Sequence, residues 1–574
     1  MAAVPAKIWK TVPCDEAAAA SLARSLAIPD PAARVLVARG FADATAAERF
    51  LNPRLSEVSD PFLLPGLDKA IARTWQAIER GESIVIYGDY DVDGITSTAL
   101  MIRVLTRLGA KVQPFLPHRM DEGYGLSMDG ISRCIAELNP RLIITVDCGT
   151  GSVEPVKAAA EQGIDVIVTD HHTPAGDVAP AVAVVNPKLG PEAGLHVLAG
   201  VGVAFKFCHA LLKRGRDGGH RESSKLDLRV HMDLVALGTI SDIVPLTGEN
   251  RILARHGLNQ LNATADLGLK KLIEVAGIKG AIDAYEVGFL LGPRLNAAGR
   301  LGDALQALEL LLTSDEARAR EIAVHLDATN RERQDIEKGI VREAMAEIDA
   351  WFKPDEHFGI VVGRKGWHPG VIGIVASRIT ARYYRPGIVI AIENGSGRGS
   401  CRSIEGCDLV DRLRQCSDLL VKFGGHTMAA GLEIAEANLA AFKQRFNESV
   451  RDVLRGNELR PTQRVDAWLS LGDADQRLFD CMDRMRPFGN GNTTPVWGVR
   501  GVSILGKPRT VGQGHLKFTV GSGGAQREAI AFNFGERGVP DGVTDVAFQL
   551  KKDSYQGREK LVLNVHDLRV AEDR

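Results

Sequence analysis

The chain is 574 residues long, carries a formal net charge of −2 and contains 45% hydrophobic residues. This length corresponds to about three or four domains, and the apolar content suffices for several cores. No apolar run approaches the ~20 residues of a membrane span and the N-terminus has no secretion signal, so we expect a cytoplasmic protein. The eight cysteines never occur as Cys-x-x-Cys, which argues against a zinc ribbon or a disulfide framework. Any nucleic-acid site must be a local groove, because the composition is not basic overall.

Three aspartates stand at alternate positions in the stretch DYDVDG. Asp89, Asp91 and Asp93 lie between a β-branched apolar run (84–88) and a segment with apolar residues at helical spacing. Carboxylates this close repel one another unless a cation compensates them. Two interpretations remain open: a metal site, and a solvated turn that caps the helix. An EF-hand loop is not supported, because its twelfth position, counted from Asp89, is Leu100 instead of an acidic residue.

Strand-like and helix-like segments alternate from about residue 67 to residue 170, which predicts a doubly wound parallel sheet. Three of its four strands end in acidic or imidazole side chains. These are the three aspartates above, then Asp147, and then Asp170, His171 and His172. Because the carboxyl ends of parallel strands share one edge of the sheet, these groups can converge there.

A later apolar segment, MDLVALGTISDIVPL, carries two more aspartates. Asp233 or Asp242 could add a carboxylate to the same edge, but the spacing does not say which of them points inward. A helix cap at Asp242 is an equally good explanation of that residue.

The segments DYDVDG, VDCGTGS, TDHH and ALGTISD, in this order, resemble the four signature segments of the DHH phosphoesterase superfamily. The segments HRMDEGYGL, NPK, LAGVGVAFK, RLNAAGRLGD and FGGHTMAAGL narrow the resemblance to the single-strand-specific DNA exonucleases of that superfamily. It extends from about residue 60 to the C-terminus. The resemblance implies a metal-dependent exonuclease that degrades single-stranded DNA in the 5′ to 3′ direction to 5′-mononucleotides, in DNA repair and recombination.

The resemblance also implies two divalent ions, Mn²⁺ or Mg²⁺, in the active site. Oxygen ligands with one or two imidazoles suit these ions, and two ions about 4 Å apart can activate a water and clamp the attacking and leaving oxygens. By resemblance, Asp91 and Asp93 hold separate ions and Asp147 bridges them.

Four further residues receive roles by the same resemblance. His171 and Asp242 complete the second ion's site, with Asp233 as the alternative carboxylate. Asp89 supports the other ion, directly or through a neighbour. His172 orients the phosphate or the leaving oxygen.

Two segments supply candidate contacts to nucleic acid. PHRMDEGYGLS opens beside the sheet edge, with Arg119 for phosphate and with Tyr124, which either stacks on a base or packs. GPRLNAAGRLGD offers Arg294, Asn296 and Arg300 as contacts along the phosphates, unless its arginines pair with nearby acids.

A second α/β domain is predicted from two strand-like runs that flank an apolar helix. The stretch GSGRGSCRS is expected to be a loop whose Arg398, Ser400 and Arg402 suit phosphate, with a flexible surface loop as the alternative. His426 is expected between glycines and a helix. The resemblance to the DHH-associated domain implies that its side chain faces the substrate cleft.

From about residue 460, five strand-like runs at short spacing with glycine turns are typical of a small barrel. Lys517 and Phe518, with Phe532 nearby, fit an OB-fold whose aromatic side chains stack on bases of single-stranded nucleic acid. Several of these aromatics should instead belong to the core.

These predictions divide the chain into five parts. They are an N-terminal helical segment (1–66), a DHH catalytic domain (67–303), a connecting helical region that acts as a spacer (304–352), a DHH-associated domain (353–456), and a connector with an OB-fold (457–574).

The expected partner is single-stranded DNA, joined by a single-strand-binding protein and a helicase by resemblance, and we expect a monomer. Two other functions stay open. An oligonucleotide phosphodiesterase of the same superfamily, acting on short RNA, would need no OB-fold. A non-catalytic, replication-associated DNA-binding scaffold would have lost metal ligands, and here all of them are present.

Overall fold

The computed structural model describes residues 7–117, 125–174, 176–512, 514–535, 537–553 and 559–571. The chain forms two compact units. The first contains Phe41–Asn330 and Asp480–Thr494, and the second contains the residues up to Gly40, Arg331–Phe479 and the residues from Pro495. Among the described residues, we find no helix with the length and hydropathy needed to cross a membrane.

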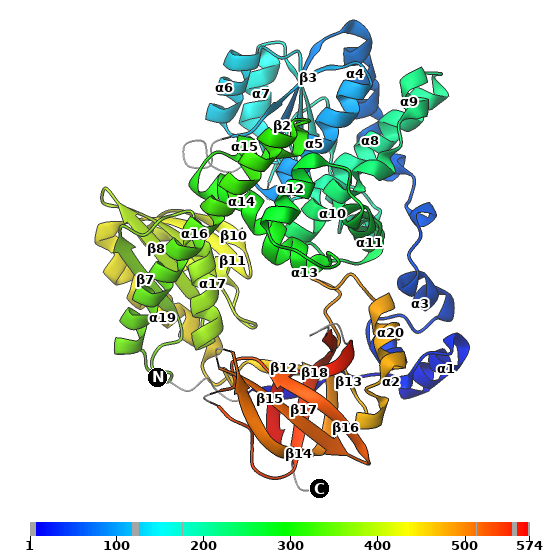
Figure 1. Cartoon of the computed structure of the whole chain (residues 1–574). Coiled ribbons are helices and arrows are strands. Elements are labelled where there is room, and N and C mark those ends of the chain that lie inside the picture. Colours follow the sequence, from blue (N-terminus) through cyan, green and yellow to red (C-terminus); the bar gives the residue numbers. More distant parts are fainter. Residues whose placement is uncertain are drawn as a thin grey trace. The chain divides into compact units, whose positions relative to one another are not determined.

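The first unit is built on a five-stranded parallel sheet with the order β3-β2-β4-β5-β6. Its strands are β2 (Ser83–Gly88), β3 (Lys111–Phe115), β4 (Leu142–Val146), β5 (Asp165–Thr169) and β6 (Ala183–Val185). Strands β2 and β3 are labelled in Figure 1. Alternate side chains of β2 enter different cores: Ile84 and Ile86 pack with α4, α5 and α8, whereas Val85 and Tyr87 pack with α6 and α7. Both faces of the sheet are therefore covered, which confirms the predicted doubly wound arrangement.

Helices make up most of the rest of this unit. They are α3 (Ala44–Leu51), α4 (Leu67–Arg80), α5 (Val92–Arg107), α6 (Met128–Leu138), α7 (Val153–Glu161), α8 (Gly200–Asp217), α9 (Arg221–Lys225), α10 (Met232–Ser241), α11 (Gly248–Asn262), α12 (Leu267–Val275), α13 (Ala284–Glu286), the π-helical turn Val287–Leu291, α14 (Gly292–Leu301) and α15 (Ala304–Leu312). The GPRLNAAGRLGD stretch therefore forms a helix, α14.

A single long helix, α16 (Glu316–Trp351), follows α15. Its residues up to Asn330 belong to the first unit and the remainder to the second. The predicted connecting helix is thus present.

The second unit contains a five-stranded mixed sheet with the order β10-β11-β9-β8-β7. Its strands are β7 (Ile360–Lys365), β8 (Gly387–Glu393), β9 (Ser396–Arg402), β10 (Leu420–His426) and β11 (Ala429–Ala435), and its helices are α17 (Ile372–Tyr383), α18 (Leu409–Arg414) and α19 (Leu439–Leu454). Only β7 and β8 pair in parallel. This is the predicted smaller α/β domain.

Two predictions in this sheet were wrong. The glycine–serine stretch is strand β9 rather than a loop, because it pairs with β8 on one side and β11 on the other. A Cβ at Gly397 would lie 2.7 Å from Ile390, and one at Gly399 would lie 2.7 Å from Leu432. Glycine is needed there for close packing, not for a turn. His426 ends β10 and leads into a hairpin with β11, not into a helix.

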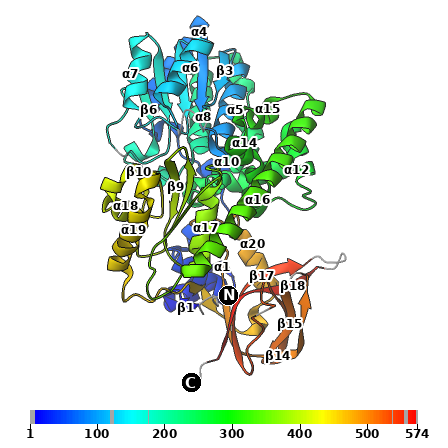
Figure 2. The same cartoon turned by 90° about the vertical axis from the view of Figure 1, so that its left-hand side faces the viewer.

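The C-terminal strands β14 (Trp497–Val511), β15 (His515–Ser522), β16 (Ala525–Ala531), β17 (Thr544–Asp553) and β18 (Lys560–Val570) curve around a common interior (Figure 2). Pairing of β14 with β17 closes the order β14-β15-β16-β18-β17 into a barrel, with Trp497 and Phe548 fully buried. The predicted OB-fold is confirmed.

The N-terminal residues contain α1 (Glu16–Leu26) and α2 (Asp30–Ala38), as predicted, but also a strand. β1 (Ile8–Thr11) pairs in parallel with β12 (Thr462–Val465), and the short β13 (Ala467–Trp468) pairs with β14.

The connector before the barrel differs from the predicted division. Asp480–Thr494, which includes the second half of helix α20 (Gln476–Arg484), belongs to the first unit, and we call it the returning segment. The Arg251 guanidinium donates hydrogen bonds to the carbonyls of Met485 (2.7 Å) and Arg484 (3.1 Å) in this segment.

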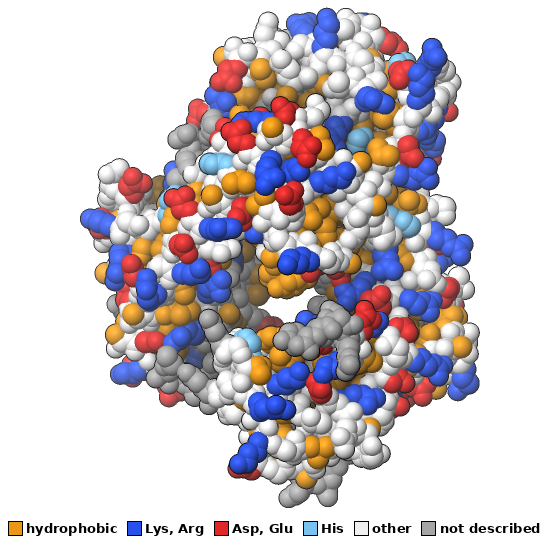
Figure 3. Space-filling model, in the orientation of Figure 1, with side chains coloured by type: hydrophobic (Ala, Val, Ile, Leu, Met, Phe, Trp, Pro, Cys, Tyr) orange, Lys and Arg blue, Asp and Glu red, His pale blue; other side chains and the backbone are white. Residues whose placement is uncertain are grey.

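On the face shown in Figure 3, Lys and Arg side chains are interspersed with Asp and Glu and do not form one continuous basic surface. This agrees with the net charge of −2.

Candidate metal centre

Side chains from several strand and helix ends meet at the carboxyl edge of the parallel sheet. They form three groups whose ligand atoms lie within 4.8 Å of one another. The groups are Asp89, Asp91 and Asp147; Asp93, His171 and Asp242; and Asp147, His171 and His172. The structure thus brings together all seven candidate catalytic residues.

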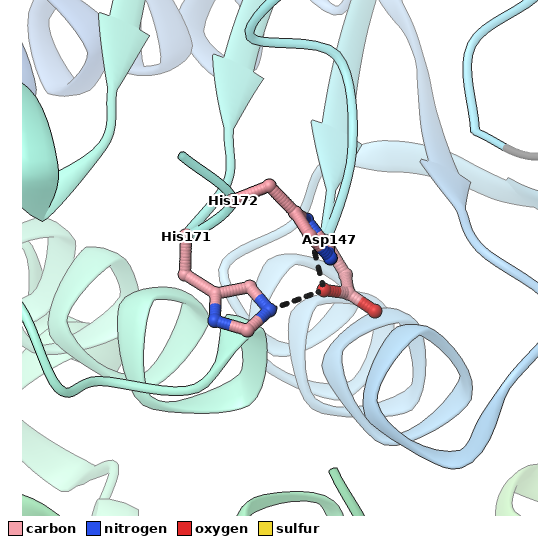
Figure 4. A group of neighbouring side chains, drawn as sticks. All are labelled: Asp147, His171 and His172. Carbon is pink, nitrogen blue, oxygen red and sulfur yellow. Dashed lines mark ion pairs between the residues drawn. The ribbon is translucent and has the colours of Figure 1, made fainter. Parts of the chain in front are cut away.

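Asp147 and His171 form the centre of this arrangement (Figure 4). Nε2 of His171 lies 3.0 Å from Oδ1 of Asp147, 3.6 Å from Oδ2 of Asp242 and 3.8 Å from Oδ2 of Asp93. Asp147 follows β4 with a φ of 63°, an uncommon conformation for a residue other than glycine. Gly200 must be glycine at this point, because a Cβ there would lie 2.8 Å from Oδ1 of Asp147.

Asp93 is fixed by the start of α8. Its Oδ2 accepts a hydrogen bond from the Gly200 N–H (2.6 Å) and its Oδ1 accepts one from the Val201 N–H (2.7 Å). The N–H groups and the dipole of a helix N-terminus favour a carboxylate at this position.

The start of α5 is fixed in a similar way. Oδ1 of Asp91 accepts hydrogen bonds from the N–H groups of Asp93 (2.9 Å) and Gly94 (3.2 Å), so Asp91 is the N-cap. Oδ1 of Asn296, on α14, accepts a hydrogen bond from the Val92 N–H (3.2 Å). Asn296, predicted to contact nucleic acid, therefore also orients the helix that carries the aspartates.

Buried like charges dominate the electrostatics of the site. Burial, followed by the charge of Asp91, raises the pKa of Asp93 to about 7. Burial, followed by the charge of Asp93, raises the pKa of Asp242 to about 9 and the pKa of Asp147 well above its usual value. Burial, followed by the charge of His172, lowers the pKa of His171 to about 3, so its imidazole is neutral near pH 7.

These residues fit divalent metal ions. Oδ1 of Asp147 and Nε2 of His171 are buried and make no hydrogen bond to any residue that the structure describes. Oxygen-rich groups with one neutral imidazole and no thiolate suit Mn²⁺ or Mg²⁺. A cation would compensate the repulsion between the carboxylates.

His172 is held by Asp170, whose Oδ1 lies 2.8 Å from Nδ1 of His172. Burial alone would lower the pKa of His172, but this hydrogen bond and the charge of Asp170 raise it. His172 can therefore carry a proton beside the metal groups.

The sequence reasoning missed two residues after β6. The buried Asn186 donates hydrogen bonds to Thr150 Oγ1 and to the His172 carbonyl, both 2.9 Å, and so ties three strand ends together. Lys188 interacts electrostatically with Asp170 and Asp242. The NPK motif, which follows a fifth strand of the same sheet, was the available signal for both residues.

Asp233, the alternative carboxylate, lies elsewhere in the structure. Its Oδ2 accepts a hydrogen bond from Thr264 Oγ1 (2.7 Å), and the side chain is buried. Asp242 is the one of the pair that lies with Asp93 and His171.

The predicted nucleic-acid-binding residues of the first unit are not all available to contact a nucleic acid. Arg294 forms an ion pair with Asp327 (2.9 Å) and donates to the Leu290 carbonyl, as in the alternative interpretation of its segment. Arg300 is partly buried on the same helix. Arg119 and Tyr124 lie outside the described residues.

In the second unit, Ser400, Arg402 and His426 share one face of the sheet. Ser400 and Arg402 are two residues apart on β9, and Ala429 pairs with both Arg402 and His426. A Cβ on Gly373, at the start of α17, would lie 3.1 Å from Ser400 Oγ and 3.2 Å from an Arg402 guanidinium nitrogen. The sheet therefore brings a hydroxyl and a guanidinium to a helix N-terminus.

The predicted nucleic-acid-binding residues of the barrel differ in their exposure and in their contacts. Phe518 is 5% exposed and belongs to the barrel interior, so it is not available to stack on a base. Lys517 forms an ion pair with Glu528 (3.2 Å). Phe532 is 47% exposed and contacts the His515 ring edge-on.

The raised carboxyl pKa values predict how stability depends on pH in the absence of metal. A carboxyl whose pKa is raised by folding stabilises the fold below its unfolded pKa, about 4, and this contribution is lost as pH rises through its folded pKa. With chelator present, the melting temperature should therefore fall between pH 5 and pH 9 as Asp93 and Asp242 ionise at about 7 and about 9.

Asp242→Asn removes one of these charges, so its melting temperature at pH 9 should exceed that of the parent chain by about 2–4 °C or more. Thermal unfolding in EDTA across this pH range measures the difference. Identical pH profiles for the two proteins would contradict the buried-charge account.

Comparisons with known proteins agree with this architecture. The family models that match are the DHH family N-terminal domain at residues 83–239, the DHHA1 domain at 357–452 and the RecJ OB domain at 465–567. The single-stranded-DNA-specific exonuclease RecJ of Bacillus subtilis (strain 168) is 38% identical over 573 residues, covering 98% of this chain and 71% of that protein. RecJ of Haemophilus influenzae is 38% identical over 539 residues, covering 90% of this chain and 92% of that protein.

Solved structures give the same result. The crystal structure of RecJ in complex with Mn²⁺ from Thermus thermophilus matches with a TM-score of 0.85 and 33% identity, covering 99% of this chain and 80% of that one. The complex with Mg²⁺ from the same organism matches with a TM-score of 0.79 and 31% identity, covering 99% and 79%. The resemblance drawn from the sequence motifs is confirmed: this chain belongs to the RecJ family of DHH proteins.

Proposed function

We propose that this chain is a metal-dependent exonuclease that hydrolyses single-stranded DNA in the 5′ to 3′ direction to 5′-mononucleotides, in DNA repair and recombination. The observation that carries the proposal is that two oxygen-rich ligand groups, Asp89–Asp91–Asp147 and Asp93–His171–Asp242, meet at one sheet edge, where Oδ1 of Asp147 lies 3.0 Å from Nε2 of His171. The similarity to single-stranded-DNA-specific exonucleases over almost the whole chain supports the substrate.

In this proposal, two Mn²⁺ or Mg²⁺ ions would share Asp147 as a ligand. Asp89 and Asp91 would hold one ion, and Asp93, His171 and Asp242 would hold the other. When bound, such ions lower the pKa of water and offset the negative charge that develops on the phosphoryl oxygens. The Gly200 and Val201 N–H groups keep the Asp93 carboxylate oriented.

His172 acts on the substrate's oxygens. Asp170 orients its ring and stabilises the imidazolium, which can donate a hydrogen bond to a phosphate oxygen or a proton to the departing 3′ oxygen. Lys188 supplies a second positive charge at the same edge.

The first test replaces the shared ligand. Asp147→Ala should lower the rate on single-stranded DNA by ~10³-fold or more, because charge stabilisation by both ions is lost. End-labelled single- and double-stranded DNA and short RNA, incubated with Mn²⁺, Mg²⁺ or EDTA, measure this rate and the substrate preference. Near-normal turnover by the variant would rule out the site, and preference for short RNA would favour an oligonucleotide phosphodiesterase.

In the second unit, we infer a binding site for a terminal 5′-phosphate at Ser400, Arg402 and His426. A terminal phosphate carries more charge than an internal diester, and a guanidinium beside a helix N-terminus can distinguish the two. Burial lowers the pKa of the half-buried Arg402, whose guanidinium donates to Ser400 Oγ and the Cys401 carbonyl.

Arg402→Ala should therefore lower activity on 5′-phosphorylated single strands about tenfold more than on 5′-hydroxyl strands, the effect of one lost charged hydrogen bond. Arg398→Ala is the matched control. Arg398 lies on the same face of β9, four residues before Arg402, and its side chain is exposed. Equal losses on both substrates would contradict end recognition.

We infer that the barrel binds the single strand through the exposed aromatic side chain of Phe532. Phe532→Ala should weaken binding to long single strands by about fivefold to 100-fold, because one stacked base is lost. Phe518→Ala should instead lower the free energy of unfolding by ~3–5 kcal/mol, because it leaves a cavity. Salt titrations of binding and thermal unfolding separate the two effects, and unchanged affinity of the Phe532 variant would exclude its role.

The non-catalytic scaffold is the weaker alternative, because every proposed ligand is present at the sheet edge. We further infer a cytoplasmic monomer that works with a single-strand-binding protein and a helicase. The proposed division of the chain keeps the catalytic, DHH-associated and OB-fold domains, with Asp480–Thr494 added to the catalytic part.

A further inference from the structure

The loop after the metal-site residue Asp242 has an unfavourable backbone conformation. Asp242 is the C-cap of α10, and the next residue, Ile243, has a φ of 61°. This left-handed conformation is common for glycine after a helix but is disfavoured for a β-branched residue. The Ile243 side chain is 70% exposed, so burial of that side chain does not hold the conformation.

Asn490 of the returning segment contacts this loop directly. Its side-chain Nδ2 donates a hydrogen bond to the Ile243 carbonyl (2.8 Å), and its backbone carbonyl accepts one from the Leu246 N–H (2.8 Å). Side chains of the loop pack against the glycines of the returning segment: a Cβ on Gly491 would lie 3.0 Å from the Pro245 side chain, and one on Gly489 would lie 2.7 Å from the Leu246 side chain.

The returning segment is itself anchored. The buried Asn492 donates hydrogen bonds to the carbonyls of Met485 (2.9 Å) and Pro487 (2.8 Å), and Gly489 and Asn492 form a bridge. The Arg251 guanidinium binds the Met485 carbonyl from α11, the helix that follows the loop. The backbone on either side of Asn490 is therefore held in place by hydrogen bonds.

Asp242 needs such support because its neighbours repel it. The charges of Asp93 and Asp91 act on its carboxylate, which lies 3.6 Å from His171 Nε2. If residue 243 relaxed to a conformation with negative φ, the chain would leave α10 in a different direction, and the contacts of Asn490 with the Ile243 carbonyl and the Leu246 N–H would no longer brace the end of the helix that carries Asp242.

We propose that Asn490 is a positioning residue for the metal centre. Its side-chain amide holds the Ile243 carbonyl, fixes the left-handed backbone, and so keeps the Asp242 carboxylate beside Asp93 and His171, which strengthens metal binding. The inference rests on the proposed function only in that the centre binds Mn²⁺.

The test uses the full chain and measures Mn²⁺ binding by the rise in melting temperature as Mn²⁺ is added, alongside the Mn²⁺ dependence of nuclease activity. Asn490→Ala should raise the Mn²⁺ concentration for the half-maximal effect about fivefold to tenfold, the effect of one lost hydrogen bond. The backbone bond from Leu246 and the Arg251 contacts remain, so the variant should fold.

Asn262→Ala is the matched control. Asn262 also donates to backbone carbonyls, those of Leu258 and Ile282, both at 2.8 Å, but it lies at the opposite end of α11, roughly 20 Å from the loop. It should lower the melting temperature without changing the Mn²⁺ concentration required. An equal shift in both variants would show a merely structural role for Asn490.

Ile243→Gly supplies the decisive comparison, because glycine adopts the left-handed conformation without a steric penalty. In that background, Asn490→Ala should change the Mn²⁺ requirement by less than about twofold. The same fivefold to tenfold effect in both backgrounds, or no effect in either, would overturn the proposal. Absence of any Mn²⁺ effect on the unaltered chain would instead contradict the proposed function.

Discussion

Compensation of buried negative charge is the constraint on which the rest of this structure depends. Several carboxylates converge at one edge of a parallel sheet, and three of them have raised pKa values because burial and neighbouring charges disfavour ionisation. The fold offsets part of this cost with the N–H groups at the start of α8, with the ion pair between His172 and Asp170, and with the nearby positive charge of Lys188. The remaining charge is what gives the site its affinity for divalent ions.

The positions of the principal ligands could be predicted from the sequence, because they follow from strand periodicity. Once β2, β4 and β5 are recognised as parallel strands, Asp89, Asp147 and His171 must lie at a shared edge. The choice between Asp233 and Asp242 could not be made in this way. They are nine residues apart along an apolar helix, about two and a half turns, so they point in opposite directions, but nothing local says which direction is inward.

Other features could not be predicted because they depend on distant residues. The glycines of β9 look like loop residues, yet they are required by Ile390 and Leu432 on the neighbouring strands. Phe518 and Phe532 both lie in an alternating pattern, and only closure of the barrel decides that the first is inside. The conformation at Ile243 has no local signal, since its hydrogen-bond partner is Asn490, 247 residues away.

The path of the chain through the two units has a consequence for how the protein is made. Every proposed metal ligand lies before residue 243, whereas the segment that contacts the loop after Asp242 ends at Thr494. Domains generally fold as they emerge during synthesis, the N-terminal ones first. A growing chain of 330 residues therefore has its parallel sheet and all its carboxylates but lacks the returning segment. The nuclease site gains its last support only when most of the protein has been synthesised, which would keep the unfinished chain weak in metal binding while it is still attached to the ribosome.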